Sequence, residues 1–243
     1  MPSSKKILII AHRGVTYSGY PENSIPGFNA VLEEGYDGVE LDVRLTKDKE
    51  LVVFHDIRLE RLTEGGRGMV RSKKLSDLQK IKLKSDTVET YIPSLSDVLE
   101  LYKHTSVFIN IEIKSEMPLR GKIEKRVVEL IYKFGLQRKV IISSFNPLVI
   151  KKIQKVDPTL RTGFIYEKRM PRLNQRLAKG LIVDSWHPNY NGITDALLEK
   201  ARESGCTVFP WTVNTETELL RMKKFNVDGV ITDFPNLARQ VLR

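Results

Sequence analysis

Short apolar runs alternate with longer amphipathic stretches from one end of the chain to the other. The runs are rich in β-branched residues and have the length of strands, whereas the stretches between them place apolar residues at helical spacing. The pattern therefore predicts strands and helices in alternation. The predicted strands are Ile7–Ala11, Gly38–Val43, Val107–Ile113, Val140–Ser143, Thr162–Ile165, Leu181–Asp184, Thr207–Pro210 and Gly229–Thr232.

The helices are predicted from apolar residues at positions i, i+3, i+4 and i+7. Their ends carry residues that can cap a helix, a hydroxyl or amide side chain at the start and glycine at the end. The predicted helical segments are Leu95–Tyr102, Ile123–Phe134, Asn146–Val156, Thr194–Ser204, Thr215–Phe225 and Pro235–Leu242. The predicted caps are Ser94, Asn146, Thr194 and Thr215 at the starts, with Gly135 and Gly205 at two of the ends.

Eight strands separated by helices in 243 residues match the size of a (β/α)8 barrel, the TIM-like fold. The alternative is an open doubly wound sheet, which usually carries a glycine-rich phosphate loop after its first strand. Here the first strand is followed by Ala11-His12-Arg13-Gly14, which is no such loop. We therefore expect one barrel domain over residues 1–243.

One region interrupts the alternation. Residues 49–55 form another short extended run, and a polar stretch with three glycines follows from Asp56 to Tyr91. Its apolar content is thin for a unit that folds alone. We interpret residues 56–91 as a small insertion in the barrel after its second strand.

Composition and charge narrow the class of protein. The net charge is +10, and residues 126–180 alone hold 13 basic and 3 acidic side chains. This basic segment is either a solvated face or a surface for anions, and no nucleic-acid-binding motif accompanies it, so we expect no nucleic-acid partner. The single cysteine, Cys206, excludes an internal disulfide framework. Without a signal peptide or a run of about 20 apolar residues, the chain is expected to be soluble and cytoplasmic.

Candidate functional residues fall at the carboxyl ends of the predicted strands, where barrel enzymes place their sites. His12 and Arg13 follow the first strand directly. Side chains alternate along a strand, so Glu40 and Asp42 share one face of the second strand. Glu112 shares a face with Lys114 in the same way on the third strand.

Three carboxylates on two neighbouring strands predict a site for a hard divalent ion, either Mg²⁺ or Ca²⁺, with Mn²⁺ as an alternative. The plainer interpretation is that Glu40 or Glu112 pairs with Lys114 or Arg44. Zinc is disfavoured, because the one cysteine is isolated and no paired histidine motif exists.

Two of the four histidines, His12 and His55, lie at strand ends beside these carboxylates, which favours acid/base catalysis. His104 is expected at the surface, and His187 at the rim as a substrate contact. Arg suits a phosphate because its planar fork binds two oxygens. Without a nucleotide-binding loop, the residues indicate metal-assisted cleavage of a phosphoester.

The motifs in this order resemble the glycerophosphodiester phosphodiesterase family over almost the whole chain. The matching segments are residues 12–14 (HRG), 21–24 (PENS), 38–43 (GVELDV), 55–56 (HD), 61–63 (RLT), 65–68 (GGRG), 92–95 (IPSL), 110–114 (NIEIK), 143–145 (SSF), 211–214 (WTVN) and 229–235 (GVITDFP). Ser24 stands where threonine is commoner, and the loop at residues 15–20 is longer than in compact members. Neither departure touches the residues expected to do chemistry.

The resemblance implies a TIM-like barrel with residues 56–91 as the family's insertion. It also implies metal-dependent hydrolysis of a small-molecule glycerophosphodiester to glycerol 3-phosphate and an alcohol, a step of glycerol and lipid metabolism. The implied metal ligands are Glu40, Asp42 and Glu112, the acid/base pair is His12 and His55, and the phosphate-facing cations are Arg13 and Lys114. Phe145 and Trp211 match apolar residues that line the substrate, although Trp211 is also compatible with a core role.

Some questions stay open at the level of the sequence. We assign His55 as the acid and His12 as the base, with the reverse equally compatible, and the attacking hydroxyl belongs either to water or to the substrate. A catalytically silent binding protein would be expected to lack one of these residues. A phospholipid-directed enzyme would contact a membrane through the basic segment at residues 126–180, aided by Phe164, Tyr166 and Met170.

Overall fold

The computed structural model describes residues 5–114, 122–167 and 170–243. The strands are β1 (Leu8–Ala11), β2 (Gly38–Leu45), β3 (Leu51–Val53), β4 (Phe108–Ile113), β5 (Val140–Ser144), β6 (Arg161–Tyr166), β7 (Ser185–Pro188), β8 (Thr207–Val208) and β9 (Gly229–Thr232). The α-helices are α1 (Ile25–Glu33), α2 (Leu75–Leu78), α3 (Leu95–Tyr102), α4 (Ile123–Lys133), α5 (Pro147–Val156), α6 (Arg172–Ala178), α7 (Asp195–Glu203), α8 (Glu216–Phe225) and α9 (Pro235–Leu242). Two 3-10 helices, η1 (Val70–Ser72) and η2 (Tyr190–Gly192), complete the elements.

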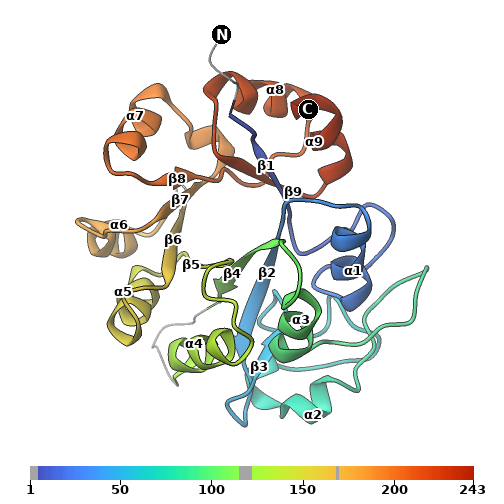
Figure 1. Ribbon diagram of the computed structural model, residues 1–243. Helices are drawn as coiled ribbons and strands as arrows, with labels where there is room; N and C mark the ends of the chain where they lie inside the picture. Colours follow the sequence, from blue (N-terminus) through green and yellow to red (C-terminus); the bar gives the residue numbers. More distant parts are fainter. Residues whose placement is uncertain (1–4, 115–121, 168–169) are drawn as a thin grey trace.

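Eight parallel strands form a nearly closed barrel in the order β8-β7-β6-β5-β4-β2-β1-β9, with helices around it (Figure 1). Backbone hydrogen bonds join the ends of this path, among them the following two. Asp228 N–H donates to Val208 O at 3.2 Å, and Ile231 N–H donates to Pro210 O at 2.9 Å. The predicted (β/α)8 barrel is confirmed.

Strand β2 shows how alternating side chains build the core and the site together. Val39, Leu41 and Val43 are fully buried in the main apolar core. Because successive side chains point to opposite faces of a strand, Glu40 and Asp42 enter the barrel interior instead. One strand therefore anchors the fold with one face and supplies two acidic groups with the other.

Part of the barrel interior below these acidic groups is apolar. A small cluster of buried residues from β1, β5, β9 and the segment after β8 fills it, separate from the core between strands and helices. Its members are Ile10, Ile141, Phe209 and Ile231. The packed interior leaves the carboxyl ends of the strands as the place for a site.

The helix caps expected from the sequence are present. Each of the four predicted capping side chains accepts a hydrogen bond from a backbone N–H in the first turn of its helix. The glycines that follow α4 and α7 have φ angles of 68° and 67°, the left-handed conformation of a helix end. The caps are Ser94, Asn146, Thr194 and Thr215, and the two glycines are Gly135 and Gly205.

The predicted strand Leu181–Asp184 is wrong. The strand at this place is β7, Ser185–Pro188, and Ile182 is 84% exposed before it. β7 turns Ser185 and His187 into the barrel, where both are fully buried, so the strand lacks the apolar pattern that marks the others. The strand was therefore predicted at the short apolar run just before it, at residues 181–183.

Three α-helices were not predicted: the four-residue α2 within residues 56–91, and the longer helices α1 and α6. Helix α1 begins with Pro26 and Gly27, which suggest a loop, but proline is tolerated in a first turn and Ser24 caps the helix through Gly27 N–H. Helix α6 has no fully buried residue, so it shows no strong apolar face to detect.

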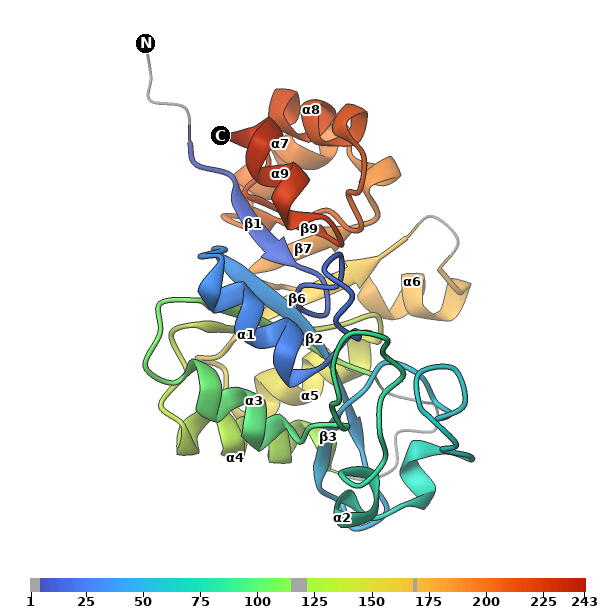
Figure 2. The same ribbon diagram turned by 90° about the vertical axis from the view of Figure 1, so that its right-hand side faces the viewer.

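The segment between β3 and α3 is an elaboration at one end of the barrel, far from α7, α8 and α9 (Figure 2). β3 runs antiparallel to β2, and η1 and α2 follow it. The segment has a small hydrophobic cluster separate from the barrel core, to which β3 and the residues beside it contribute. Its members are Val52, Phe54, Leu59, Val70, Leu78, Leu83 and Ile92. The sequence interpretation of residues 56–91 as unable to fold alone stays a prediction.

Among the helices of the described residues, none combines the length and apolar character that crossing a bilayer requires.

Candidate active site

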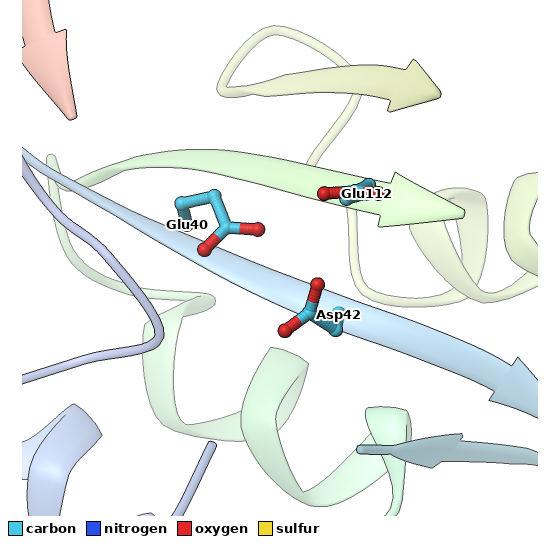
Figure 3. Close-up of side chains that lie close together, drawn as sticks. All are labelled: Glu40, Asp42 and Glu112. Atoms are coloured by element: carbon cyan, nitrogen blue, oxygen red, sulfur yellow. The ribbon is translucent and has the colours of Figure 1, made fainter. Parts of the chain in front are cut away.

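Three buried carboxylates meet inside the carboxyl end of the barrel. Glu40 and Asp42 come from β2 and Glu112 from β4, and the parallel register pairs Asp42 with Glu112 (Figure 3). One ligand oxygen from each lies within 4.8 Å of the others. The three residues are no more than 7% exposed. The alternation and register of two strands thus bring together the carboxylates predicted as metal ligands.

Two cations lie beside this cluster. Lys114 Nζ is 2.6 Å from Glu112 Oε1 and 3.1 Å from Asp42 Oδ1. Arg13 Nε is 3.2 Å from Asp42 Oδ2, and its backbone N–H donates to Glu40 Oε2 at 3.0 Å. The plainer expectation of a carboxylate paired with Lys114 is therefore also met.

The positive charges balance the cluster only in part. Burial would raise the pKa of Asp42, but the Lys114 ammonium and the Arg13 guanidinium hold that pKa well below its ordinary value. Burial raises the pKa of Glu40 and of Glu112, and the charge of neighbouring Asp42 adds to both shifts. With three carboxylates against the two positive charges of Lys114 and Arg13, the cluster can accept further positive charge.

The donor set fits a hard divalent cation. All three groups offer oxygen, the ligand that Ca²⁺ and Mg²⁺ prefer, and neither histidine nor cysteine joins the cluster in the part of the chain that the structure describes. Asp42 Oδ1 is buried and accepts no hydrogen bond. Arg44, the other cation considered for the cluster, donates to the backbone carbonyl of His55 at 2.8 Å.

His12 follows β1, and the neighbouring strand β9 supplies its partner. His12 Nδ1 lies 2.6 Å from Asp233 Oδ1, and Asn214 Nδ2 donates to the other oxygen of Asp233 at 2.6 Å. His12 Nε2 faces the cluster, 3.8 Å from Glu40 Oε2. Burial would lower the pKa of His12, but the hydrogen bond to Asp233 and the charge of Glu40 raise it above the ordinary 6.5.

His55 lies just after β3, and its partner belongs to the following segment. His55 Nδ1 lies 2.7 Å from Asp56 Oδ1. Arg61 donates to both oxygens of Asp56 at 2.6 and 2.7 Å and to both oxygens of Glu22 at 3.0 and 3.1 Å. Glu22 also accepts from Arg13 Nη1 at 2.8 Å. Burial lowers the pKa of His55 below the ordinary 6.5, and the nearby cations offset the raising effect of the carboxylates.

The turn after β1 is held in an uncommon backbone conformation. Arg13 and Asn23 have φ angles of 58° and 57°, and Asn23 N–H donates to Arg13 O at 2.9 Å. The Asn23 side chain bonds Asp42 twice, from Nδ2 to Oδ2 at 2.8 Å and from the Asp42 N–H to Oδ1 at 3.1 Å. Left-handed residues other than glycine cost about 1 kcal/mol or more, so these contacts hold a strained turn against the site.

One cavity of about 190 Å³ joins these groups. Every site residue predicted from the sequence lines it except Asp42, which contacts Lys114 at its edge. The lining residues from that prediction are His12, Arg13, Glu40, His55, Glu112, Lys114, Phe145 and Trp211. The cavity is small beside the roughly 300–1,000 Å³ of sites for drug-sized ligands, which favours a small ligand.

The two aromatic residues form one wall. Phe145 and Trp211 meet edge to face with centroids 5.3 Å apart, and Lys114 Nζ lies 5.8 Å from the Phe145 ring centre. Trp211 also packs on the inner apolar cluster, and its Nε1 donates to His187 O at 2.9 Å. Trp211 thus lines the cavity and supports the barrel interior at once.

The two remaining histidines differ in position. His104 is exposed, as expected. His187 was expected at the rim; it lies on β7, is fully buried, and lines the cavity from the barrel interior.

Sequence reasoning missed the partners of both histidines. Asp56 directly follows His55, so its position alone could have suggested it. Asp233 directly follows β9, which the closed barrel places beside β1, so the contact with His12 follows once closure is assumed. Arg61 and Glu22 are separated by 39 residues and carry no local signal of their contact.

The surface expected to contact a membrane is described in part. Met170 is only 6% exposed, and Phe164 and Tyr166 are half-buried with their rings stacked 6.1 Å apart. Lys168 and Arg169 lie outside the described residues. The membrane contact stays a prediction.

A parallel barrel with its polar cavity at the carboxyl ends of the strands defines the class of TIM-barrel enzymes. The model of the glycerophosphoryl diester phosphodiesterase family matches residues 12–237, and the chain belongs to this family of phosphoric diester hydrolases. A glycerophosphodiester phosphodiesterase from Caldanaerobacter subterraneus subsp. tengcongensis is 38% identical over 98% of both chains.

Solved structures show the same fold. The glycerophosphodiester phosphodiesterase from Thermotoga maritima superimposes with a TM-score of 0.76 at 25% identity, over 98% of this chain and 100% of that one. A phosphodiesterase from Oleispira antarctica, described in complex with the product sn-glycerol-3-phosphate, gives a TM-score of 0.85 at 24% identity, over 97% of this chain and 96% of that one.

Proposed function

We propose that this protein hydrolyses a glycerophosphodiester to glycerol 3-phosphate and an alcohol, with a divalent metal ion at Glu40, Asp42 and Glu112 and with His12 and His55 as the acid/base pair. The observation that carries the proposal is the meeting of an oxygen-only cluster and two histidines at one cavity. Each histidine is held at Nδ1 by a carboxylate, which leaves Nε2 for the substrate. The product bound to the Oleispira protein supports a glyceryl phosphate as the ligand.

Arg13 and Lys114 bind the phosphate in this proposal. Both line the cavity, and both keep their positive charge because carboxylates surround them. Glu22 orients the Arg13 guanidinium through Nη1. A divalent ion at the three carboxylates, when bound, supplies Lewis-acid stabilisation of the charge that develops on the phosphate oxygens.

The histidines carry the proton transfers. The acceptor histidine takes the proton of the attacking hydroxyl through Nε2, and a new P–O bond forms as the P–O bond to the alcohol breaks. The donor histidine gives its Nε2 proton to the departing alkoxide oxygen, and the alcohol leaves neutral. The attacking hydroxyl comes from water or from the glyceryl unit; in the second case, water then opens a cyclic phosphate.

The pKa shifts favour one division of roles. A donor must carry a proton at neutral pH, and Asp233 raises the pKa of His12 from the side of the ring away from the cluster. An acceptor must be neutral, and the pKa of His55 is lowered. We therefore propose His12 as the donor and His55 as the acceptor, the reverse of the assignment made from the sequence.

A metal-resolved activity screen tests the function. The substrates are glycerophosphocholine, glycerophosphoethanolamine, glycerophosphoglycerol and a lysophospholipid, each with EDTA and then with Mg²⁺, Mn²⁺ or Ca²⁺. Release of glycerol 3-phosphate that EDTA abolishes and a divalent ion restores is the expected result. No turnover of any diester under any metal would contradict the proposal.

Calorimetry tests the metal site separately from turnover. Glu112→Gln keeps the shape of the side chain and removes its charge, so metal affinity should fall about tenfold or more. Glu124→Gln is the matched control, because Glu124 is also buried but lies on α4 against Lys152. Equal metal affinity in the two variants would remove Glu112 from the ligand set.

A further inference from the structure

Two uncharged polar side chains that line the cavity are buried, and each has at least one polar atom without a hydrogen-bond partner. Neither amide atom of Asn110 makes a hydrogen bond, and Asn110 is 1% exposed. His187 is 0% exposed, and its Nδ1 has no partner. Buried polar groups are nearly always hydrogen-bonded, because an unmade bond costs free energy. Both residues line the cavity of the candidate active site.

Asn110 lies on β4, two residues before Glu112. The register of β2 and β4 pairs it with Glu40, so it sits at the inner side of the carboxylate cluster. Its amide offers both a donor and an acceptor, and a hydroxyl group is the complementary ligand because it also donates and accepts.

His187 lies on β7, three strands along the barrel from β4. Its Nε2 lies 2.8 Å from Ser185 Oγ, and its ring meets the edge of Phe209 with centroids 5.5 Å apart. A methyl group at Gly163 would lie 2.7 Å from His187 Nε2, so the glycine keeps space for the ring. Burial lowers the pKa of His187 to about 3, so the ring is neutral and can bond a hydroxyl through Nδ1.

We propose that Asn110 and His187 form a subsite for the free hydroxyl groups of the glyceryl unit. The proposal rests on the proposed function. It adds Asn110, which the sequence analysis did not single out, and assigns a ligand group to His187, which was expected only as a substrate contact. Asn110 and His187 are both neutral. The cations Arg13 and Lys114 lie beside the carboxylate cluster and the catalytic histidines, so we expect the phosphate to bind at that place. The uncharged glyceryl hydroxyls are then expected at Asn110 and His187.

The choice of the glyceryl unit over the alcohol follows from enclosure. Ile231 of the inner apolar cluster also lines the cavity, and Asn110 and His187 are at most 1% exposed, so a group bonded to both lies inside the barrel. The glyceryl unit is the small part that all glycerophosphodiesters share, whereas the alcohol varies in size. A buried site built to bond a hydroxyl discriminates strongly against an analogue that lacks it.

The test measures binding, so it does not depend on turnover. Calorimetry in saturating Mg²⁺ compares glycerol 3-phosphate with 3-hydroxypropyl phosphate, which lacks the 2-hydroxyl, and with 2-hydroxypropyl phosphate, which lacks the terminal one. The wild-type protein should bind glycerol 3-phosphate about three- to tenfold more tightly than the analogue lacking a bonded hydroxyl. Asn110→Leu and His187→Phe keep the approximate shape of each side chain without its polar atoms, and each should reduce that preference toward one.

Ser143→Ala is the matched control. The Ser143 hydroxyl is also buried without a partner, on the neighbouring strand β5, but Ser143 is not among the residues that line the cavity. Its preference should equal that of the wild type. Asn110→Ala replaces Asn110→Leu where circular dichroism shows that the leucine variant does not fold.

The outcomes separate the two proposals. A wild-type protein that turns over no diester and binds no glycerol 3-phosphate would contradict the proposed function. Tight binding of glycerol 3-phosphate with no preference over the analogues, or with the same preference in both variants as in the wild type, would overturn the subsite alone. An equal loss of preference in Ser143→Ala would assign the effect to general repacking and would also overturn it.

Discussion

The two histidines of the site are held by different parts of the molecule. His12 and its partner Asp233 lie at the ends of β1 and β9, which are paired in the barrel along four registered residue pairs. His55 and Asp56 stand at the start of the segment between β3 and α3, and Arg61 of that segment bonds both Asp56 and Glu22. The contacts that hold His12 belong to the barrel wall. The contacts that hold His55 depend on ion pairs between the segment after β3 and the turn after β1.

The difference lies in exposure as well as connectivity. The His12 side chain is 18% exposed and the His55 side chain 31%, and the Arg61 side chain that completes the second support is 51% exposed. Exposed ion pairs contribute about 0–1 kcal/mol and weaken with salt, whereas a bond between strand ends persists as long as the barrel does. The orientation of His55 should therefore be easier to perturb than that of His12, although both are expected to be needed for turnover.

The largest effect is expected when either histidine is removed. His12→Ala and His55→Ala should each lower kcat by roughly 10²–10⁴-fold, because each deletes one proton transfer. Steady-state kinetics on glycerophosphocholine measures the loss, and calorimetry should show metal binding retained. His104→Ala, at an exposed histidine, is the control. A variant within threefold of the wild type would remove that histidine from the catalytic pair.

Replacing the carboxylate partners should have intermediate effects. Asp233→Asn and Asp56→Asn each keep the shape and remove the charge that orients a ring, so kcat should fall about 10- to 100-fold with KM little changed. If neither substitution alters kcat, then Asp233 and Asp56 do not position the histidine rings for catalysis.

In the pH profile of kcat/KM, replacing Asp233 should shift one limb and replacing Asp56 the other. With His55 neutral and His12 protonated in the active form, kcat/KM rises as His55 loses its proton and falls as His12 loses its own. Asp233 raises the pKa of His12, so Asp233→Asn should move the alkaline limb to lower pH. The hydrogen bond of Asp56 raises the pKa of His55, so Asp56→Asn should move the acid limb to lower pH. Shifts on the other limbs would contradict the division of roles.

The smallest effect is expected at Arg61. Arg61→Gln should lower kcat a few-fold, and the loss should shrink as salt increases, because salt already weakens the link in the wild type. Arg58→Gln is the control, since Arg58 is similarly exposed but pairs with Glu60. Equal kcat in the two variants at low salt would show that the ionic link does not hold His55.

Some of these residues and contacts could be predicted from the sequence, and others could not. Glu40, Asp42 and Glu112 were predictable, because alternation and strand ends follow from local pattern. β7 was not, because its inward side chains are polar and resemble no core strand. The pairing of His12 with Asp233 depends on which strands close the barrel, and the bond of Arg61 to Glu22 depends on how a separate segment docks. Both contacts depend on the tertiary structure, which the local sequence pattern does not predict.

Leaving-group dependence tests whether the two histidines divide the proton transfers. A nitrophenyl phosphodiester of glycerol releases an acidic phenol that needs little protonation. Compared on this substrate and on glycerophosphocholine, His12→Ala should recover most of its lost kcat on the nitrophenyl ester, while His55→Ala should not. Recovery by His55→Ala instead would reverse the roles, and equal losses on both substrates in both variants would contradict the claim that one histidine donates and the other accepts.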